Sequence, residues 1–146
     1  MSRIVVGIDG SEESRRALAW AAAEARLRDA PLRVVHTWLF PYTAVGPGLD
    51  PVLDTQMIED VRRAAENVVE SELAGLGEEL AGVDVERVVV EGAAAPVLIE
   101  AAEGADLLVV GSRGRGGFAG LLLGSVGQQC AHHAPCPLVI VPRATH

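Results

Sequence analysis

Lysine is absent from this chain of 146 residues, and all twelve of its basic residues are arginines. This absence excludes the enzyme classes that depend on a lysine amine, such as P-loop ATPases, Schiff-base enzymes and lysine-dependent kinases. Twenty Asp and Glu residues leave a formal charge of −8 at pH 7. The negative charge disfavours duplex nucleic acid and acidic membrane surfaces as partners.

Cysteine, aromatic residues and long apolar runs are also scarce. The two cysteines, Cys130 and Cys136, are too few for a disulfide framework. Aromatic residues make up only 3% of the chain but hydrophobic residues 49%, so Ala, Val and Leu must build the core. No apolar run reaches the roughly 18 residues of a membrane span, and no signal peptide is evident. We therefore expect a single cytoplasmic domain over residues 1–146, with no membrane partner.

Five short apolar runs alternate with four helical patterns. Most of the runs are continuously apolar, which is typical of parallel strands buried on both faces. The predicted strands are Arg3–Ile8, Leu32–Trp38, Val83–Val90, Asp106–Val110 and Pro137–Val141. The predicted helices are Ser11–Arg28, Asp54 to about Leu80, a short helix from Pro96 that ends before Gly104, and Ser125 to about His133. This alternation predicts a three-layer α/β fold, with a parallel sheet and helices on both faces.

Two stretches fit no regular element. Leu39–Leu53 is rich in Pro and Gly, and the sequence assigns it no role. Ser112–Leu123 contains four glycines and lies between a predicted strand and a predicted helix. Glycines let the backbone approach an anion closely and adopt positive φ, and a helix N-terminus favours negative charge. The second stretch therefore predicts a phosphate site, with a surface loop and Ser125 as a plain N-cap as the alternative.

Other chemistry is poorly supported by the sequence. Gly114-x-Gly116-x-x-Ala119 matches a dinucleotide-binding pattern, but it follows the fourth strand instead of the first. Adjacent His132 and His133 would point about 100° apart on a helix, so we expect no metal site there. His36 is expected to be packed or hydrogen-bonded. No nucleophile elbow and no HExxH motif occurs, so no catalytic residue is predicted.

The spacing Gly111-x2-Gly114-x9-Gly124-Ser125 resembles the nucleotide-binding signature G-x2-G-x9-G-[ST] of the universal stress protein family. The resemblance extends over essentially the whole chain. The segments that carry it are Val5–Ser11, Val35-His36, Ala105–Gly114 and Cys136–Val141. It implies a Rossmann-like sheet of five parallel strands in the order 3-2-1-4-5, of the adenine nucleotide alpha hydrolase-like type, and a bound ATP.

The resemblance also implies which residues bind the nucleotide. Asp9 would lie beside the adenine and ribose, and the backbone of Thr37 would read the adenine edge. The remaining implied contacts are Val110 and Gly111 at the ribose, and Gly114, Gly124, Ser125 and Val126 at the phosphates. A divalent ion such as Mg²⁺ or Mn²⁺ on the phosphates is compatible with this arrangement. The alternatives are that Asp9 caps the first helix, that Thr37 only ends a strand, and that Val126 belongs to the core.

The predicted function is that of a bacterial, ATP-binding regulatory module of the stress response, with little or no intrinsic catalysis. The sequence offers neither a lysine nor an evident water-activating base for efficient hydrolysis. A slow ATP-hydrolysing or adenylyl-transfer enzyme and a nucleotide-free dimeric scaffold remain open alternatives. A homodimer through the last strand is also expected, because an apolar edge strand is a template for association. The residues of that strand are Leu138, Val139, Ile140 and Val141.

Overall fold

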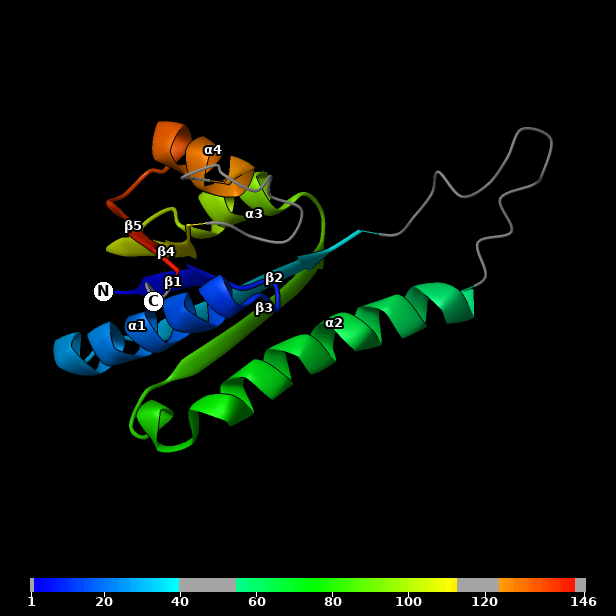
Figure 1. Ribbon diagram of the computed structural model, residues 1–146, viewed down its shortest axis with the longest axis horizontal. Coiled ribbons are helices and arrows are strands. Elements are labelled where there is room, and N and C mark those ends of the chain that lie inside the picture. The colour runs from blue at the N-terminus through cyan, green and yellow to red at the C-terminus, as the bar shows by residue number, and fades with distance from the viewer. Residues whose placement is uncertain (1, 40–54, 113–123, 144–146) are drawn as a thin grey trace.

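A computed structural model describes residues 2–39, 55–112 and 124–143 of the chain. Its elements are β1 (Ile4–Gly7), α1 (Glu12–Arg28), β2 (Leu32–Trp38), α2 (Thr55–Leu76), the 3₁₀ helix η2 (Gly77–Leu80), β3 (Val85–Glu91), α3 (Ala94–Ala101), β4 (Leu107–Gly111), α4 (Ser125–His133) and β5 (Leu138–Val141). The five strands form one sheet in the order β3-β2-β1-β4-β5, and all four pairings are parallel (Figure 1). The predicted fold class and strand order are confirmed.

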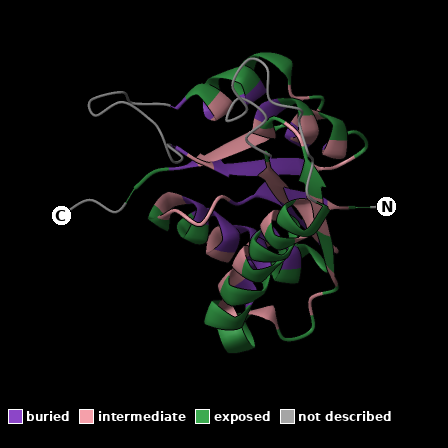
Figure 2. Cartoon of the chain, turned by 90° about the vertical axis from the view of Figure 1, so that its right-hand side faces the viewer, coloured by how far each residue is buried: buried purple, intermediate pink, exposed green. Residues whose placement is uncertain are grey.

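The sheet separates two apolar cores. Successive side chains of a strand point to opposite faces, so Ile4 and Val6 of β1 face α1 and α2, whereas Val5 faces α3 and α4. Figure 2 shows the buried strands between two outer layers of helices. Nearly all of this core is Ala, Val, Leu and Ile, as the scarcity of aromatic residues requires. In the part of the chain that the structure describes, no helix could cross a membrane.

Helix α1 begins and ends where its sequence signals predict. The Ser11 hydroxyl accepts a hydrogen bond from the Ser14 amide at 3.2 Å, which makes Ser11 the N-cap. The helix ends at Asp29, which takes the left-handed conformation with φ 53°. Its buried face is mostly alanine, with Leu18 as the one large side chain. Small side chains let the helix axis lie close to the sheet.

Most element boundaries lie within one residue of the sequence prediction, and three differ by more for a clear physical reason. The predicted helix to Leu80 is interrupted, because Gly77 takes a φ of +54° and the chain continues as the 3₁₀ helix η2. Strand β3 starts at Val85 because the amide of Val83 is still bonded to the Leu80 carbonyl in a turn. Helix α3 starts at Ala94, so Pro96 lies inside its first turn. A proline is tolerated there because first-turn amides have no partner within the helix.

Candidate functional site

A pocket opens at the carboxyl ends of β1, β2 and β4. It contains about 500 Å³ of space, part of it open to solvent. The chain leaves β1 toward β2 on one side and enters β4 on the other, so the pocket lies at the point where the strand order reverses. Open α/β sheets bind their ligands at such a point. The lining residues are Gly7, Ile8, Asp9, Ser14, Val35, Thr37, Ala94, Leu98, Val110, Gly111, Val126 and Gly127.

Five of the eight predicted site residues line this pocket. Asp9, Thr37, Val110, Gly111 and Val126 come from four separate elements or turns, and the fold brings them together. The described residues also include Gly124 and Ser125, which lie at the start of α4 next to Val126.

Two predicted features cannot be compared with the structure. Gly114 and the rest of segment 113–123 lie outside the described residues. The same holds for residues 40–53 of the stretch Leu39–Leu53.

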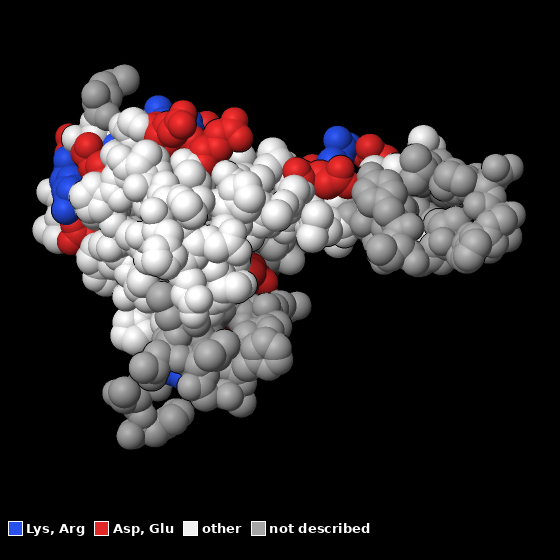
Figure 3. Space-filling model, turned by 90° about the horizontal axis from the view of Figure 1, so that it is seen from above, with Lys and Arg blue, Asp and Glu red and all other residues white. Residues whose placement is uncertain are grey.

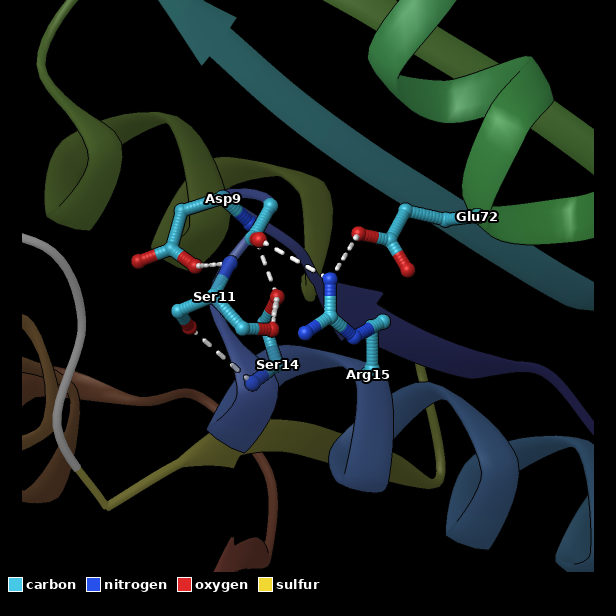
Figure 4. A network of polar contacts seen from close by, with 6 residues as sticks. Asp9, Ser11, Ser14, Arg15 and Glu72 are labelled. Carbon is cyan, nitrogen blue, oxygen red and sulfur yellow. Dashed lines mark hydrogen bonds and ion pairs between the residues drawn. The ribbon is translucent and has the colours of Figure 1, made fainter. Parts of the chain in front are cut away.

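Asp9 lies in a hydrogen-bonded turn between β1 and α1 (Figure 4). One of its carboxylate oxygens accepts a hydrogen bond from the Ser11 amide at 2.9 Å, and its own amide donates to the Ser14 hydroxyl at 3.1 Å. The Ser14 hydroxyl in turn donates to the Ser11 carbonyl at 3.1 Å. Because Ser11 is the N-cap of α1, Asp9 braces the turn that precedes the helix and is not its cap. The alternative of a plain capping residue is therefore wrong.

The geometry also locates two residues for which the sequence left alternatives. Thr37 is paired with Val90 near the end of β2 and lines the pocket. Val126 packs against the core on the α3–α4 side and also lines the pocket. His36 is hydrogen-bonded through its Nδ1 atom to the Ile8 carbonyl at 2.8 Å, as predicted.

Helix α4 spans Ser125–His133, as predicted. Its N-cap is Gly124, so the alternative of Ser125 as a plain N-cap is wrong. The amide of Gly124 donates to the Ser112 carbonyl at 2.7 Å, and its φ of −72° is one that any residue adopts. Gly124 therefore neither offers its N–H to an anion nor needs a positive φ. Ser125, Val126 and Gly127 form the first turn, where an α-helix provides no acceptor for backbone amides.

Two glycines of the pocket allow helices to approach the sheet. A Cβ on Gly111 would lie 2.9 Å from both the carbonyl carbon and the Cβ of Glu13 at the start of α1. A Cβ on Gly7 would lie 2.8 Å from two methyl carbons of Leu98 in α3. The prediction assigned Gly111 to the ligand and overlooked Gly7. A glycine inside a strand marks a close approach, so the sequence Val5-Val6-Gly7-Ile8 held this signal.

Helix α2 contributes a nearly buried carboxylate beside the turn. The Glu72 side chain is 8% exposed, and its Oε1 atom lies 3.7 Å from the Nη1 atom of Arg15. Burial raises the pKa of Glu72, and the charge of Asp9 acts in the same direction, while Arg15 and His36 act to lower it. The sequence analysis did not predict a role for Glu72, because a single acidic residue in an amphipathic helix is normally part of the solvent-exposed face.

The pocket combines apolar walls with polar groups at its rim. Val35, Ala94, Leu98 and Val110 supply flat apolar contact, whereas Asp9, Thr37 and the first turn of α4 supply donors and acceptors. Pockets of this character hold small ligands that have a flat apolar part and a polar or anionic part. Within residues 2–39, 55–112 and 124–143, no cluster of three or more His, Cys, Asp or Glu side chains could hold a metal ion.

The sheet order and the pocket at its switch point define a Rossmann-like α/β protein. The model of the universal stress protein family matches residues 1–142. The chain belongs to this family, as the resemblance of its glycine spacing predicted.

Relatives of known sequence come from mycobacteria. A universal stress protein of Mycobacterium tuberculosis is 40% identical over 137 residues, which is 94% of this chain and 44% of the relative. One from Mycolicibacterium smegmatis is 38% identical over 141 residues, which is 94% of this chain and 47% of the relative. The chain thus spans about half the length of these relatives.

Solved structures show the same fold. The universal stress protein UspA from Lactobacillus plantarum aligns with a TM-score of 0.78 at 22% identity, over 96% of this chain and 97% of that one. A universal stress protein in complex with cAMP aligns with a TM-score of 0.62 at 30% identity, over 98% of each chain.

Proposed function

We propose that this chain binds an adenine nucleotide in the pocket at the carboxyl ends of β1, β2 and β4, and that the physiological ligand is ATP. The proposal is based on one observation: an apolar subsite and a subsite rich in backbone donors lie in the same pocket. Apolar walls from β2, β4 and α3 suit a purine base, and the first turn of α4 suits a phosphate. The solved relative in complex with cAMP, at 30% identity, supports an adenine nucleotide as the ligand class.

Each predicted site residue has a part in this proposal. Asp9 accepts hydrogen bonds from the ribose, and the backbone of Thr37 reads the adenine edge. Val110 and Gly111 pack against the ribose. Ser125 and Val126 donate backbone amides to the phosphates, with the Ser125 hydroxyl as a further donor, while Gly124 acts only as the N-cap. Gly114 is proposed as a phosphate contact on the glycine spacing alone, as is a Mg²⁺ or Mn²⁺ ion held mainly by the phosphates.

The bound nucleotide acts in this proposal as a regulatory ligand that is turned over slowly or not at all. Asp9 is the one titratable side chain among the described residues that line the pocket, and one of its oxygens already accepts the Ser11 amide. Efficient phosphoryl transfer needs a group that orients the attacking nucleophile, whereas Asp9 in this proposal is held in the turn and contacts the ribose. The cytoplasmic location expected from the sequence agrees with two cysteines that are both free.

The proposal is tested by finding out what the protein carries and what it binds. Purified protein is denatured, and the released small molecules are identified by mass spectrometry. Calorimetry with ATP, AMP, cAMP and GTP then ranks the ligands. Binding of ATP above GTP supports the proposal, and binding of AMP or cAMP but not ATP overturns the choice of ATP. If the protein neither releases nor binds a nucleotide, it is a scaffold and the proposal is wrong. Turnover of ATP at about 1 s⁻¹ or faster would instead identify an ordinary enzyme.

A further inference from the structure

Glu72 is the feature that the proposed function leaves unused. It lies near the end of α2, on the side of that helix that meets the turn between β1 and α1 (Figure 4). Its side chain is 8% exposed, whereas that of its partner Arg15 is 57% exposed. Among the residues that the structure describes, Arg15 is its one ion-pair partner. An acid this well covered, with a single counter-charge, is uncommon on an otherwise solvated helix.

Arg15 joins Glu72 to the turn through a single atom. The Nη1 atom of Arg15 lies 3.7 Å from Glu72 Oε1, and the same atom donates a hydrogen bond to the Gly10 carbonyl at 3.4 Å. Gly10 has a φ of +82°, a conformation that glycine adopts without strain. Its carbonyl belongs to the peptide that links Gly10 to Ser11, whose amide donates a hydrogen bond to the Asp9 carboxylate.

We propose that Glu72 is a positioning residue for nucleotide binding: through Arg15 it fixes the Gly10 carbonyl and thereby the orientation in which the turn presents Asp9 to the ligand. This inference rests on the proposed nucleotide site. It gives α2 a direct part in binding, although no residue of α2 lines the pocket.

The energetics favour positioning over stabilisation. Burial raises the pKa of Glu72, which means that the folded protein bears a cost for its charge. The charged groups that act on it are Arg15 from α1, Asp9 from the turn and His36 from β2. Nearly buried ion pairs often contribute little to stability, but the loss of one partner leaves the other without its counter-charge. Replacing Glu72 with glutamine should therefore leave the protein no easier to unfold at pH 7 and still loosen the turn.

The experiment compares two variants of the pair with matched controls on the same helices. Glu72→Gln and Arg15→Met break the link, and Arg15→Lys keeps a charged donor. Glu70→Gln, also on α2, breaks an exposed ion pair with Arg87. Arg16→Met, also on α1, removes a hydrogen bond to the Pro142 carbonyl, away from the turn. ATP affinity is measured by calorimetry, exchange of the Asp9 and Ser11 amides by NMR, and stability by urea unfolding.

We expect Glu72→Gln and Arg15→Met to weaken ATP binding about three- to tenfold and to speed exchange of the Ser11 amide, without loss of stability in Glu72→Gln. Arg15→Lys and both controls should bind within about twofold of the parent. Parental affinity in Glu72→Gln overturns the proposal, and so does equal weakening in the controls. If the parent binds no ATP, the proposed function fails. The positioning role of Glu72 is then judged by amide exchange alone, and unchanged exchange of the Ser11 amide in Glu72→Gln overturns it.

Discussion

Two glycines of the candidate site are needed for close packing of the helices on the sheet. The family resemblance placed Gly111 at the ribose, yet the start of α1 lies directly against it. Gly7 is similar, because it leaves room for Leu98, which also lines the pocket. A glycine in a binding motif can therefore be required by the fold even before a ligand is considered.

Replacement of Gly111 by alanine should destabilise the protein by about 1–3 kcal/mol, because the new Cβ meets backbone atoms that cannot turn aside. Gly75→Ala is the matched control. Gly75 lies in α2 with nothing within 4 Å of its Cβ position, so alanine should add about 0.5–1 kcal/mol of stability. Urea unfolding measures both. If Gly111→Ala is as stable as the parent, α1 can move away from the sheet without a loss of stability.

Ser125→Ala tests the hydroxyl at the start of α4. The N-cap is Gly124, so the loss of this hydroxyl should leave the helix intact. ATP binding should weaken by about 1–2 kcal/mol, the scale of a hydrogen bond to a charged group. Calorimetry measures the change, with Ser71→Ala on the exposed face of α2 as the control. An affinity equal to that of the parent would remove Ser125 from the phosphate contacts.

At the scale of elements, α2 is the helix whose contribution changes with pH. Burial raises the pKa of Glu72 in the folded protein above its ordinary value of 4.5. An acid with a raised pKa binds its proton more tightly in the folded state, so its contribution to stability is largest below about 4.5 and is lost as pH rises through the raised pKa. The unfolding free energy of the parent should therefore rise relative to that of Glu72→Gln as pH falls from 7.

This difference is measured by urea unfolding of the two proteins side by side at several pH values. Acids that lie too far from Glu72 to interact with it cancel in this comparison. A gap between parent and variant that stays constant with pH would mean that Glu72 has an ordinary pKa.

Element types were predictable, and their ends were less so. Strands β1 and β4 are continuous apolar runs, which fit a buried position, and α1 has capping signals at both ends. Gly77 was harder to interpret, because a glycine ends a helix only when the chain beyond it turns away. Pro96 suggested the first residue of α3, but the whole first turn of a helix accepts proline.

At the scale of the whole molecule, the site was only half readable from the sequence. The family resemblance implied Asp9, Thr37 and Val126 at the site, and all three line the pocket. The contribution of α3 through Ala94 and Leu98, and of α2 through Glu72, depends on how the helices pack. No local pattern encodes such contacts, since they join residues far apart along the chain.

The molecule has one side with few charges. Helices α3 and α4 together contain a single charged residue of the Asp, Glu, Lys and Arg types, Glu100. Figure 3 looks onto this side and shows a broad surface almost free of charged side chains. Edge strand β5 borders the same layer, and Leu138, Val139 and Ile140 are all half-buried. These features support the proposed homodimer through β5.

Light scattering at tens of micromolar should give twice the 15.3 kDa mass of one chain. Val139→Lys should shift the population toward the monomer, because a charge on the edge opposes pairing. Val141 is unsuited to this test, since it is 7% exposed and belongs to the core, whereas Val139 packs against the same core but is only partly buried. Circular dichroism verifies that the variant is folded. A parent that scatters as a monomer would contradict the dimer.

Trp38 gives the protein an optical reporter. Its indole nitrogen is buried and has no hydrogen-bond partner within the described part of the chain, so it absorbs and emits in an environment without the usual polar contact. It directly follows Thr37, which lines the pocket. Since Trp20 is the only other tryptophan, Trp20→Phe leaves a single tryptophan, at the end of β2. Its emission wavelength and quantum yield would then report the packing at this end of the strand, without any attached dye.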